Sequence, residues 1–287
     1  MHECVMKNVR SGQRGHTCWF DTIVTTVSNS SAARAYVMGK SNDNLMKDIV
    51  SSVTSGNNAE QQKLHELISS TINGDSCPMK PTGGQSALGF LKALLQVLDV
   101  GHVISSTTAT HNISGLRMMV KGETIGAIFD LGTYLENDVK KKIVFMHDYR
   151  PTGMYAVQVL APTRNFARVV PRDVYKFIYE DLEMTLEIKN MLVSSNGHIM
   201  TYGTCNNPTE WFVYDNEYAA AGGLPKRLKS ESFENTMELI YRFPHTYFSP
   251  AMGSVSMNPL HLEGLASATT FVFDYKITKL KRNSTYL

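Results

Sequence analysis

The sequence has few cysteines and lacks the cysteine pairs of a zinc ribbon. Its four cysteines lie at positions 4, 18, 77 and 205, and no two of them are spaced as Cys-x-x-Cys. We therefore expect no metal site, and no cofactor motif is present. No apolar stretch approaches the length of a membrane span, and residues 1–13 are mixed polar without the apolar region of a secretory leader. These absences predict a cytoplasmic or nuclear protein without a membrane partner.

The chain also lacks a strong charge of either sign. It has 28 Lys and Arg against 26 Asp and Glu, a formal net charge of +2 at pH 7, and 19% charged residues. Two short basic runs, at 140–142 and 279–282, are typical of solvated element ends. This balance argues against a nucleic acid partner. With 287 residues, the chain is long enough for one domain with a large core.

Hydrophobic periodicity divides the chain into a helical first third and a β-rich remainder. Apolar stripes with helical spacing lie at Leu45–Val53, at Ala59–Ile72 and around Phe90–Leu98. From about residue 102 the pattern favours strands, interrupted by one helix expected at Asp173–Leu182. The expected strands are Leu116–Val120, Thr124–Phe129, Ile143–His147, Tyr155–Leu160, Met184–Val193, 199–204, 210–214, 237–243 and 269–277. We predict one α+β domain over 1–287, with a helical subdomain (1–100) packed on an antiparallel β-rich subdomain (101–287).

Cys18 lies where a further helix is expected to begin. The apolar residues at 19, 20, 23, 24 and 27 recur at the spacing of an amphipathic helix. A thiol at a helix N-terminus feels the positive end of the macrodipole, which favours the reactive thiolate. Gln13 precedes the helix and carries an amide that can face an oxyanion. Cys18 is thus the candidate nucleophile, whereas Cys205 is expected to be structural and Cys4 to lie in a mobile terminal segment.

A general base and a group that orients it lie far downstream. His198 begins an alternating run that suits a strand, and Asp215 ends a second run. Asn206–Thr209 has turn chemistry, so the two strands are predicted to form an antiparallel hairpin. His198 and Asp215 are 17 residues apart, and such a hairpin can bring their side chains together. Cys, His and Asp supply a nucleophile, a base and a group that fixes the tautomer of the base.

Four short motifs follow one another along the chain. Residues 13–19 read Gln-Arg-Gly-His-Thr-Cys-Trp, and residues 84–91 read Gly-Gln-Ser-Ala-Leu-Gly-Phe-Leu, with further leucines at 94, 95 and 98. Gly197-His198 precedes Tyr202 and a Trp-Phe-Val-Tyr-Asp run at 211–215, and residues 269–275 read Thr-Thr-Phe-Val-Phe-Asp-Tyr. In order, these segments resemble the cysteine box, the Gln-containing helix, the histidine box and the last strand of the ubiquitin-specific proteases, a family of papain-like cysteine proteases. The resemblance spans nearly the whole chain, although residues 100–180 match no motif.

The resemblance implies a papain-like cysteine protease fold with a triad of Cys18, His198 and Asp215, and with Gln13 in the oxyanion hole. It further implies a channel for the substrate's tail that is lined by Gln85, Gly197 and Trp211. The implied activity is that of a thiol-dependent isopeptidase, or deubiquitinase-like hydrolase, which cleaves after a Gly-Gly tail. The implied partners are conjugates of ubiquitin or of a ubiquitin-like protein, with no cofactor required.

The chain departs from the family pattern at positions that bear on the substrate. Gln13 replaces the usual oxyanion Asn, as in papain. His16 replaces the second Asn of the cysteine box, and Asn216 stands where a second Asp is common, so both are auxiliary candidates. Ser86 and Gly89 replace an Asp and a Glu that face the arginines of ubiquitin's tail in the family. Each lost contact weakens binding of a buried arginine by about 1.5–3 kcal/mol, so we expect catalysis to be retained and the substrate to be altered.

Three other functions agree with parts of this pattern. A transglutaminase-like enzyme also uses Cys, His and Asp, but its Cys–His separation is much shorter than the 180 residues found here, and it has no counterpart of the Gln85 helix. A non-catalytic binder of a ubiquitin-like protein would tolerate the missing carboxylates at 86 and 89. A processing protease for a Gly-Gly-type site in a precursor protein would share the chemistry and differ only in its substrate.

Overall fold

The structure is a computed structural model that describes residues 4–12, 17–72, 87–108, 113–120, 123–160, 168–169, 171–195, 198–220, 222–247 and 268–280. Five residues to which the sequence assigns a place in the site lie outside these ranges, namely Gln13, His16, Gln85, Ser86 and Gly197. Among the described helices, none combines the length and the apolar character needed to cross a membrane.

The first described third of the chain is helical, as predicted. Its helices are α1 (Val5–Asn8), α2 (Cys18–Asn29), α3 (Ser31–Val37), α4 (Asp43–Ser55), α5 (Asn58–Ile72) and α6 (Ala87–Val97). The predicted apolar stripes are the buried faces of α4, α5 and α6, because their members recur every three or four residues and point to one core. Gly56 caps the C-terminus of α4, and its φ of +67° is a left-handed conformation that glycine adopts without a Cβ clash.

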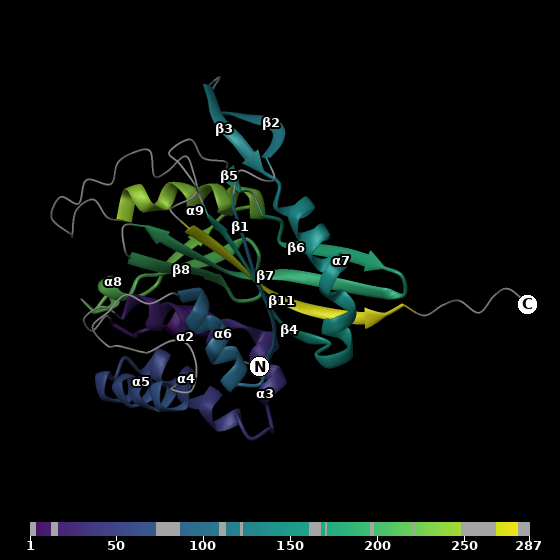
Figure 1. Ribbon diagram of the computed structural model, residues 1–287. Coiled ribbons are helices and arrows are strands. Elements are labelled where there is room, and N and C mark those ends of the chain that lie inside the picture. Colours follow the sequence, from purple (N-terminus) through teal and green to yellow (C-terminus); the bar gives the residue numbers. More distant parts are fainter. Residues whose placement is uncertain are drawn as a thin grey trace, which may run out of the picture.

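The rest of the chain forms a large sheet of eight strands and a small sheet of three. The large sheet has the order β1-β4-β11-β7-β8-β9-β10, with β6 paired to β7, and only the β1–β4 pair is parallel among its described pairs. Its strands are β1 (Gly101–Thr108), β4 (Thr152–Leu160), β6 (Val174–Tyr179), β7 (Leu182–Ser195), β8 (His198–Thr204), β9 (Glu210–Tyr214), β10 (Lys226–Lys229) and β11 (Ala268–Lys279). The small sheet holds β2 (Ile113–Val120), β3 (Glu123–Phe129) and β5 (Arg168–Val169), and it projects beyond the large one (Figure 1).

Alternating side chains give the large sheet two apolar faces and hence two cores. On β4, Met154 and Ala156 pack with the helices α1 to α6, while Tyr155 and Val157 pack on the opposite face. That opposite core also contains α7 (Leu131–Tyr149) and α9 (Phe233–Tyr247). Figure 1 shows α2 to α6 gathered on one side of the sheet and α9 on the other. The fold is therefore a central sheet between two helical layers.

Three predicted elements were wrong in type. Residues 143–147, predicted as a strand, belong to α7, because Leu135, Val139 and Ile143 recur every four residues and are buried on one face. Residues 237–243, also predicted as a strand, belong to α9, where Met237 and Ile240 share a buried face with Phe233. The helix predicted at Asp173–Leu182 is the strand β6, whose side chains alternate and pair with β7.

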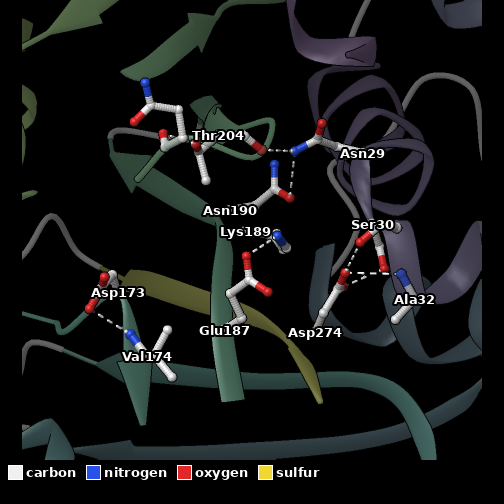
Figure 2. Close-up of polar contacts among 12 residues, drawn as sticks. Asn29, Ser30, Ala32, Asp173, Val174, Glu187, Lys189, Asn190, Thr204 and Asp274 are labelled. Atoms are coloured by element: carbon white, nitrogen blue, oxygen red, sulfur yellow. Dashed lines mark hydrogen bonds and ion pairs between the residues drawn. The ribbon is translucent and has the colours of Figure 1, made fainter. Parts of the chain in front are cut away.

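Buried polar contacts fix the end of α2 and the start of α3 to the sheet (Figure 2). The Asn29 amide donates to the Thr204 carbonyl of β8 at 3.0 Å and to Asn190 Oδ1 of β7 at 3.3 Å. The Asp274 carboxylate of β11 accepts hydrogen bonds from the Ser30 and Ser31 hydroxyls and from the Ala32 backbone N–H. Because an unpaired buried donor is costly, these contacts define how the helical layer sits on the sheet, and α2 carries Cys18 at its other end.

Cys4 and Cys205 form a disulfide, with a Cα–Cα distance of 5.3 Å. The expectation that Cys4 lies in a mobile segment is therefore wrong, since the bond ties residues before α1 to the end of β8. The structural role expected for Cys205 takes the form of this bond. Among the described cysteines, Cys18 alone keeps a free thiol.

Candidate active site

The β8–β9 hairpin brings His198 and Asp215 together. The strands pair antiparallel with Thr201 opposite Tyr214, so the predicted hairpin is confirmed. His198 Nε2 lies 3.0 Å from Asp215 Oδ1, which is hydrogen-bonding distance. The Asp215 side chain is 1% exposed and that of His198 is 20% exposed. A buried carboxylate thus occupies one nitrogen of the imidazole and leaves the other, Nδ1, for a second partner.

Cys18 comes from α2 and lies close enough to the ring to act on its protonation. It is the first residue of the helix, it is buried, and its interaction with the imidazole raises the pKa of His198. The contact is built by packing of α2 on β8. Thr22, one helical turn after Cys18, donates to the carbonyl of Ile199, the residue after His198, at 3.3 Å. The Thr201 hydroxyl returns a 3.4 Å hydrogen bond to the Thr22 carbonyl.

The surroundings of His198 favour its protonated form. Burial of the ring lowers the pKa of His198, but the hydrogen bonds with Asp215 and Cys18 and the charges of Asp215 and Glu217 outweigh this effect and raise the pKa to about 10. The ring is therefore an imidazolium at neutral pH. An imidazolium can stabilise a neighbouring thiolate and can give a proton to a departing group.

Asp21 joins the segments around the start of α2 through hydrogen bonds, and it is not among the site residues predicted from the sequence. Its buried carboxylate accepts hydrogen bonds from Ser11 Oγ at 3.1 Å, Thr17 Oγ1 at 2.9 Å and Asn216 Nδ2 at 2.8 Å. Asn216 therefore faces Asp21 and not the imidazole, so the auxiliary group predicted there acts at most indirectly. One feature could have pointed to this role: Asp21 is an acidic residue in the first turn of α2, a helix that is buried along its whole length.

The residues on both sides of 13–16 are held in place. Thr17 is bound by Asp21, and the Ser11 carbonyl accepts a 2.7 Å hydrogen bond from the Tyr214 hydroxyl. Gly12 packs against the helix α8 (Asn216–Ala220), so closely that a Cβ added to it would lie 2.8 Å from the Ala220 Cα. The oxyanion role of Gln13 and the auxiliary role of His16 remain predictions, because both residues lie outside the described ranges.

Glu217 is a second carboxylate at the imidazole and was also missed. Its Oε1 lies 3.7 Å from His198 Nδ1, and its backbone N–H donates to Asp215 Oδ1 at 2.9 Å. The ligand atoms of His198, Asp215 and Glu217 lie within 4.8 Å of one another, a clustering found once among the described residues. The contacts that these three groups make to each other account for the clustering, so we assign no metal to it.

Trp211, one of the three residues predicted to line the tail channel, lies away from this site. Trp211 is fully buried on the face of the sheet opposite α2, near Phe233, and its indole N–H donates to the Pro208 carbonyl at 3.0 Å. It therefore serves the core, because alternation along β9 directs Phe212 and Tyr214, and not Trp211, toward the helical layer. Gln85 and Gly197 lie outside the described ranges.

No protein-family model matches the sequence, and no curated protein matches it with significance. Solved structures do match the fold. A structure of the SAGA Ubp8/Sgf11/Sus1/Sgf73 DUB module, in which Ubp8 carries a serine-to-asparagine substitution, matches with a TM-score of 0.51 and 9% identity, over 98% of this chain and 71% of the other. The structure of the same module bound to ubiquitin aldehyde matches with a TM-score of 0.50 and 8% identity, over 98% and 72%. The predicted α+β, papain-like fold class is confirmed by this likeness, which at such identity concerns the fold alone.

Proposed function

We propose that the protein is a thiol-dependent, deubiquitinase-like hydrolase that cleaves after the Gly-Gly tail of ubiquitin or of a ubiquitin-like protein. The observation that carries the proposal is the meeting of three elements at one imidazole. Cys18 comes from the start of α2, His198 from β8 and Asp215 from the end of β9. Asp215 is hydrogen-bonded to the ring, and the Cys18 side chain is close enough to raise the pKa of the ring. The likeness of the fold to a DUB module supports the same class.

The proposed first half-reaction forms an acyl-enzyme. The Cys18 thiolate attacks the carbonyl carbon of the tail's last glycine, and the electron pair of the carbonyl moves to its oxygen. Gln13 and the backbone N–H of Cys18, at the N-terminus of α2, are assigned to that oxyanion. His198 Nδ1 then gives its proton to the amine nitrogen as the C–N bond breaks, which leaves a thioester on Cys18.

The second half-reaction hydrolyses the thioester. The neutral imidazole takes a proton from a water molecule as the water oxygen attacks the thioester carbon, and collapse of this intermediate releases the free tail and the thiolate. Asp215 remains on Nε2 in both halves and keeps Nδ1 directed at the reacting atoms. Nothing in this sequence of steps requires a cofactor.

Fewer described residues bear on the tail of the substrate than on the reacting groups. Gln85 and Gly197 keep their proposed places in the channel, and Trp211 is no longer included. Gly89 is an exposed residue of α6 and offers no carboxylate to an arginine of the tail. We therefore favour a tail that is less basic than that of ubiquitin.

Hydrolysis of a panel of Gly-Gly conjugates tests the proposal. Isopeptide conjugates of ubiquitin and of ubiquitin-like proteins, and precursor peptides spanning a Gly-Gly site, are incubated with the wild type and with Cys18→Ala, His198→Ala and the control Cys77→Ala. We expect release of the amine product from at least one Gly-Gly conjugate by the wild type and the control, and by neither triad variant. Cleavage of the peptides alone would favour the processing protease, and tight binding without turnover would favour the non-catalytic binder. Either result contradicts the proposed function.

A further inference from the structure

Two carboxylates from one short segment bracket the active-site imidazole. Asp215 lies at Nε2, and Glu217, two residues later, lies 3.7 Å from Nδ1. In the part of the chain that the structure describes, the titratable groups that act on the ring are the Cys18 thiol from α2, Asp215 from the end of β9 and Glu217 from α8. Since Asp215 occupies Nε2, Nδ1 is the nitrogen that exchanges protons with the substrate in the proposed reaction.

The two carboxylates differ in what they can reach. The Asp215 side chain is 1% exposed and is confined to the imidazole, whereas that of Glu217 is 31% exposed. At 3.7 Å, Glu217 is also beyond normal hydrogen-bonding distance from Nδ1. Its carboxylate is thus close enough to stabilise a positive charge at Nδ1. Because it is partly exposed, it can also interact with a second cation that approaches from the solvent.

The leaving group of the proposed reaction brings such a cation. The amine nitrogen must come within about 3 Å of Nδ1 to accept its proton, so it lies at most about 7 Å from Glu217 Oε1 and on the same side of the ring. As the proton moves from Nδ1 to nitrogen, and before the C–N electron pair returns to it, that nitrogen carries a positive charge. The more basic the amine, the more fully this charge is developed in the transition state.

On the basis of the proposed function, we infer that Glu217 is a specificity-determining residue that stabilises the positive charge on the departing amine. It thereby selects substrates whose leaving group is a strongly basic alkylamine, such as the ε-amine of lysine, over those that release a weakly basic aromatic amine. A structural role for Glu217 resides in its backbone N–H, which holds Asp215 and survives any change of the side chain.

Two substrates with the same acyl part separate this role from others. A Gly-Gly conjugate on a lysine ε-amine and the same Gly-Gly acyl group on an aminocoumarin are compared for the wild type, Glu217→Gln and Glu217→Asp. Glu231→Gln is the control, since it removes the same charge from an exposed turn. We expect Glu217→Gln to lower kcat/KM about tenfold more for the lysine conjugate than for the aminocoumarin, with Glu217→Asp in between and no such difference for the control.

An equal loss on both substrates would overturn the inference, because it would mean that Glu217 acts only through the imidazole. If Glu217 acted only through the imidazole, the pKa on the alkaline side of the kcat/KM profile would fall by the same amount for both leaving groups. A wild type that turns over neither substrate would overturn the proposed function and this inference together. Turnover of both with equal loss in Glu217→Gln would overturn this inference alone.

Discussion

His198 Nε2 and Asp215 Oδ1 lie 3.0 Å apart, and this contact decides which nitrogen of the imidazole faces Cys18. The same oxygen, Oδ1, also accepts a hydrogen bond from the backbone N–H of Glu217, so two donors hold it in place. With Nε2 occupied, the proton that moves in the proposed reaction is the one on Nδ1. The pKa of the ring, raised to about 10, follows from the same contact together with those of Cys18 and Glu217.

Asp215→Asn should lower the pKa that limits kcat/KM at alkaline pH. The amide retains a hydrogen-bond acceptor but loses the charge that stabilises the imidazolium, so the pKa of His198 moves from about 10 toward its ordinary value of 6.5. We expect kcat/KM at pH 8 to fall by about tenfold or more. Asp148→Asn is the control, because Asp148 faces His147 at the exposed end of α7. An unchanged pH profile in Asp215→Asn would show that Asp215 does not set the protonation of His198.

The same pair makes part of the stability depend on pH. His198 binds its proton more tightly in the folded state, with a pKa of about 10, than in the unfolded state, with a pKa near 6.5. Its contribution to the free energy of unfolding is therefore fully present below about pH 6.5 and is lost as the pH rises to about 10. Urea unfolding at pH 6.5 and 10 should show a larger decrease for the wild type than for Asp215→Asn, and an equal decrease would contradict the linkage.

Asp21→Ala should destabilise the protein and slow the modification of Cys18. The change leaves the Ser11 and Thr17 hydroxyls and the Asn216 amide without their buried acceptor. We expect a loss of about 2–4 kcal/mol in the free energy of unfolding, measured by urea titration. Asp48→Ala removes an exposed carboxylate from α4 and should change stability by less than about 0.5 kcal/mol. Similar values for the two variants would mean that the Asp21 contacts are not formed.

Gly12→Ala tests whether α8 positions the segment before Cys18. The new Cβ would meet the Ala220 backbone at 2.8 Å, so either the segment or α8 must shift, and Gln13 moves with it. We expect kcat/KM to fall by about 10- to 100-fold with a loss of stability of only about 1–3 kcal/mol. Gly132→Ala makes the same chemical change in α7, where the nearest atom is 3.4 Å away, and should retain full activity. Full activity in Gly12→Ala would remove Gln13 from the proposed oxyanion hole.

The positions of Cys18, His198 and Asp215 in the fold could be predicted from sequence because the three residues sit at element boundaries with recognisable local patterns. Cys18 precedes an apolar helical stripe, and His198 and Asp215 flank a hairpin with a polar turn. Asp21 and Glu217 could not be predicted in the same way. Their side chains contact residues of other elements, and a local sequence pattern does not indicate such tertiary contacts. Both were nonetheless visible as acidic residues close in sequence to predicted site residues.

The errors have equally specific causes. Residues 143–147 and 237–243 contain β-branched or aromatic residues, which taken alone favour strands. Over a longer stretch, the four-residue spacing from Leu135 to Ile143 indicates a helix. The resemblance places Trp211 in the channel, yet which face of β9 meets the helical layer depends on sheet packing that the sequence does not reveal. Cys4 and Cys205 are 201 residues apart, and no sequence spacing predicts such a pair.

The double variant Ser86→Asp and Gly89→Glu tests the proposed preference for a less basic tail. These changes restore the carboxylates that would pair with arginines of ubiquitin's tail, so turnover of ubiquitin conjugates should rise, chiefly through a lower KM. Ser86→Asn with Gly89→Gln is the matched neutral control. If the wild type already cleaves ubiquitin conjugates efficiently and the charged variant is no better, the altered-tail proposal is wrong.

Mapping the attachment site of a Gly-Gly-ended electrophilic probe tests the central claim most directly. The wild type is treated near neutral pH with probes built on ubiquitin and on other ubiquitin-like proteins, then digested and analysed by mass spectrometry. Cys4 and Cys205 are joined in a disulfide, and Cys18 is a free thiol beside His198, whose pKa is raised to about 10. One probe molecule should therefore attach per chain, on the peptide that contains Cys18. His198→Ala should slow the attachment strongly, and Cys18→Ala should abolish it. Equal labelling of Cys18→Ala, or attachment to Cys77 in the wild type, would contradict the assignment of Cys18 as the nucleophile.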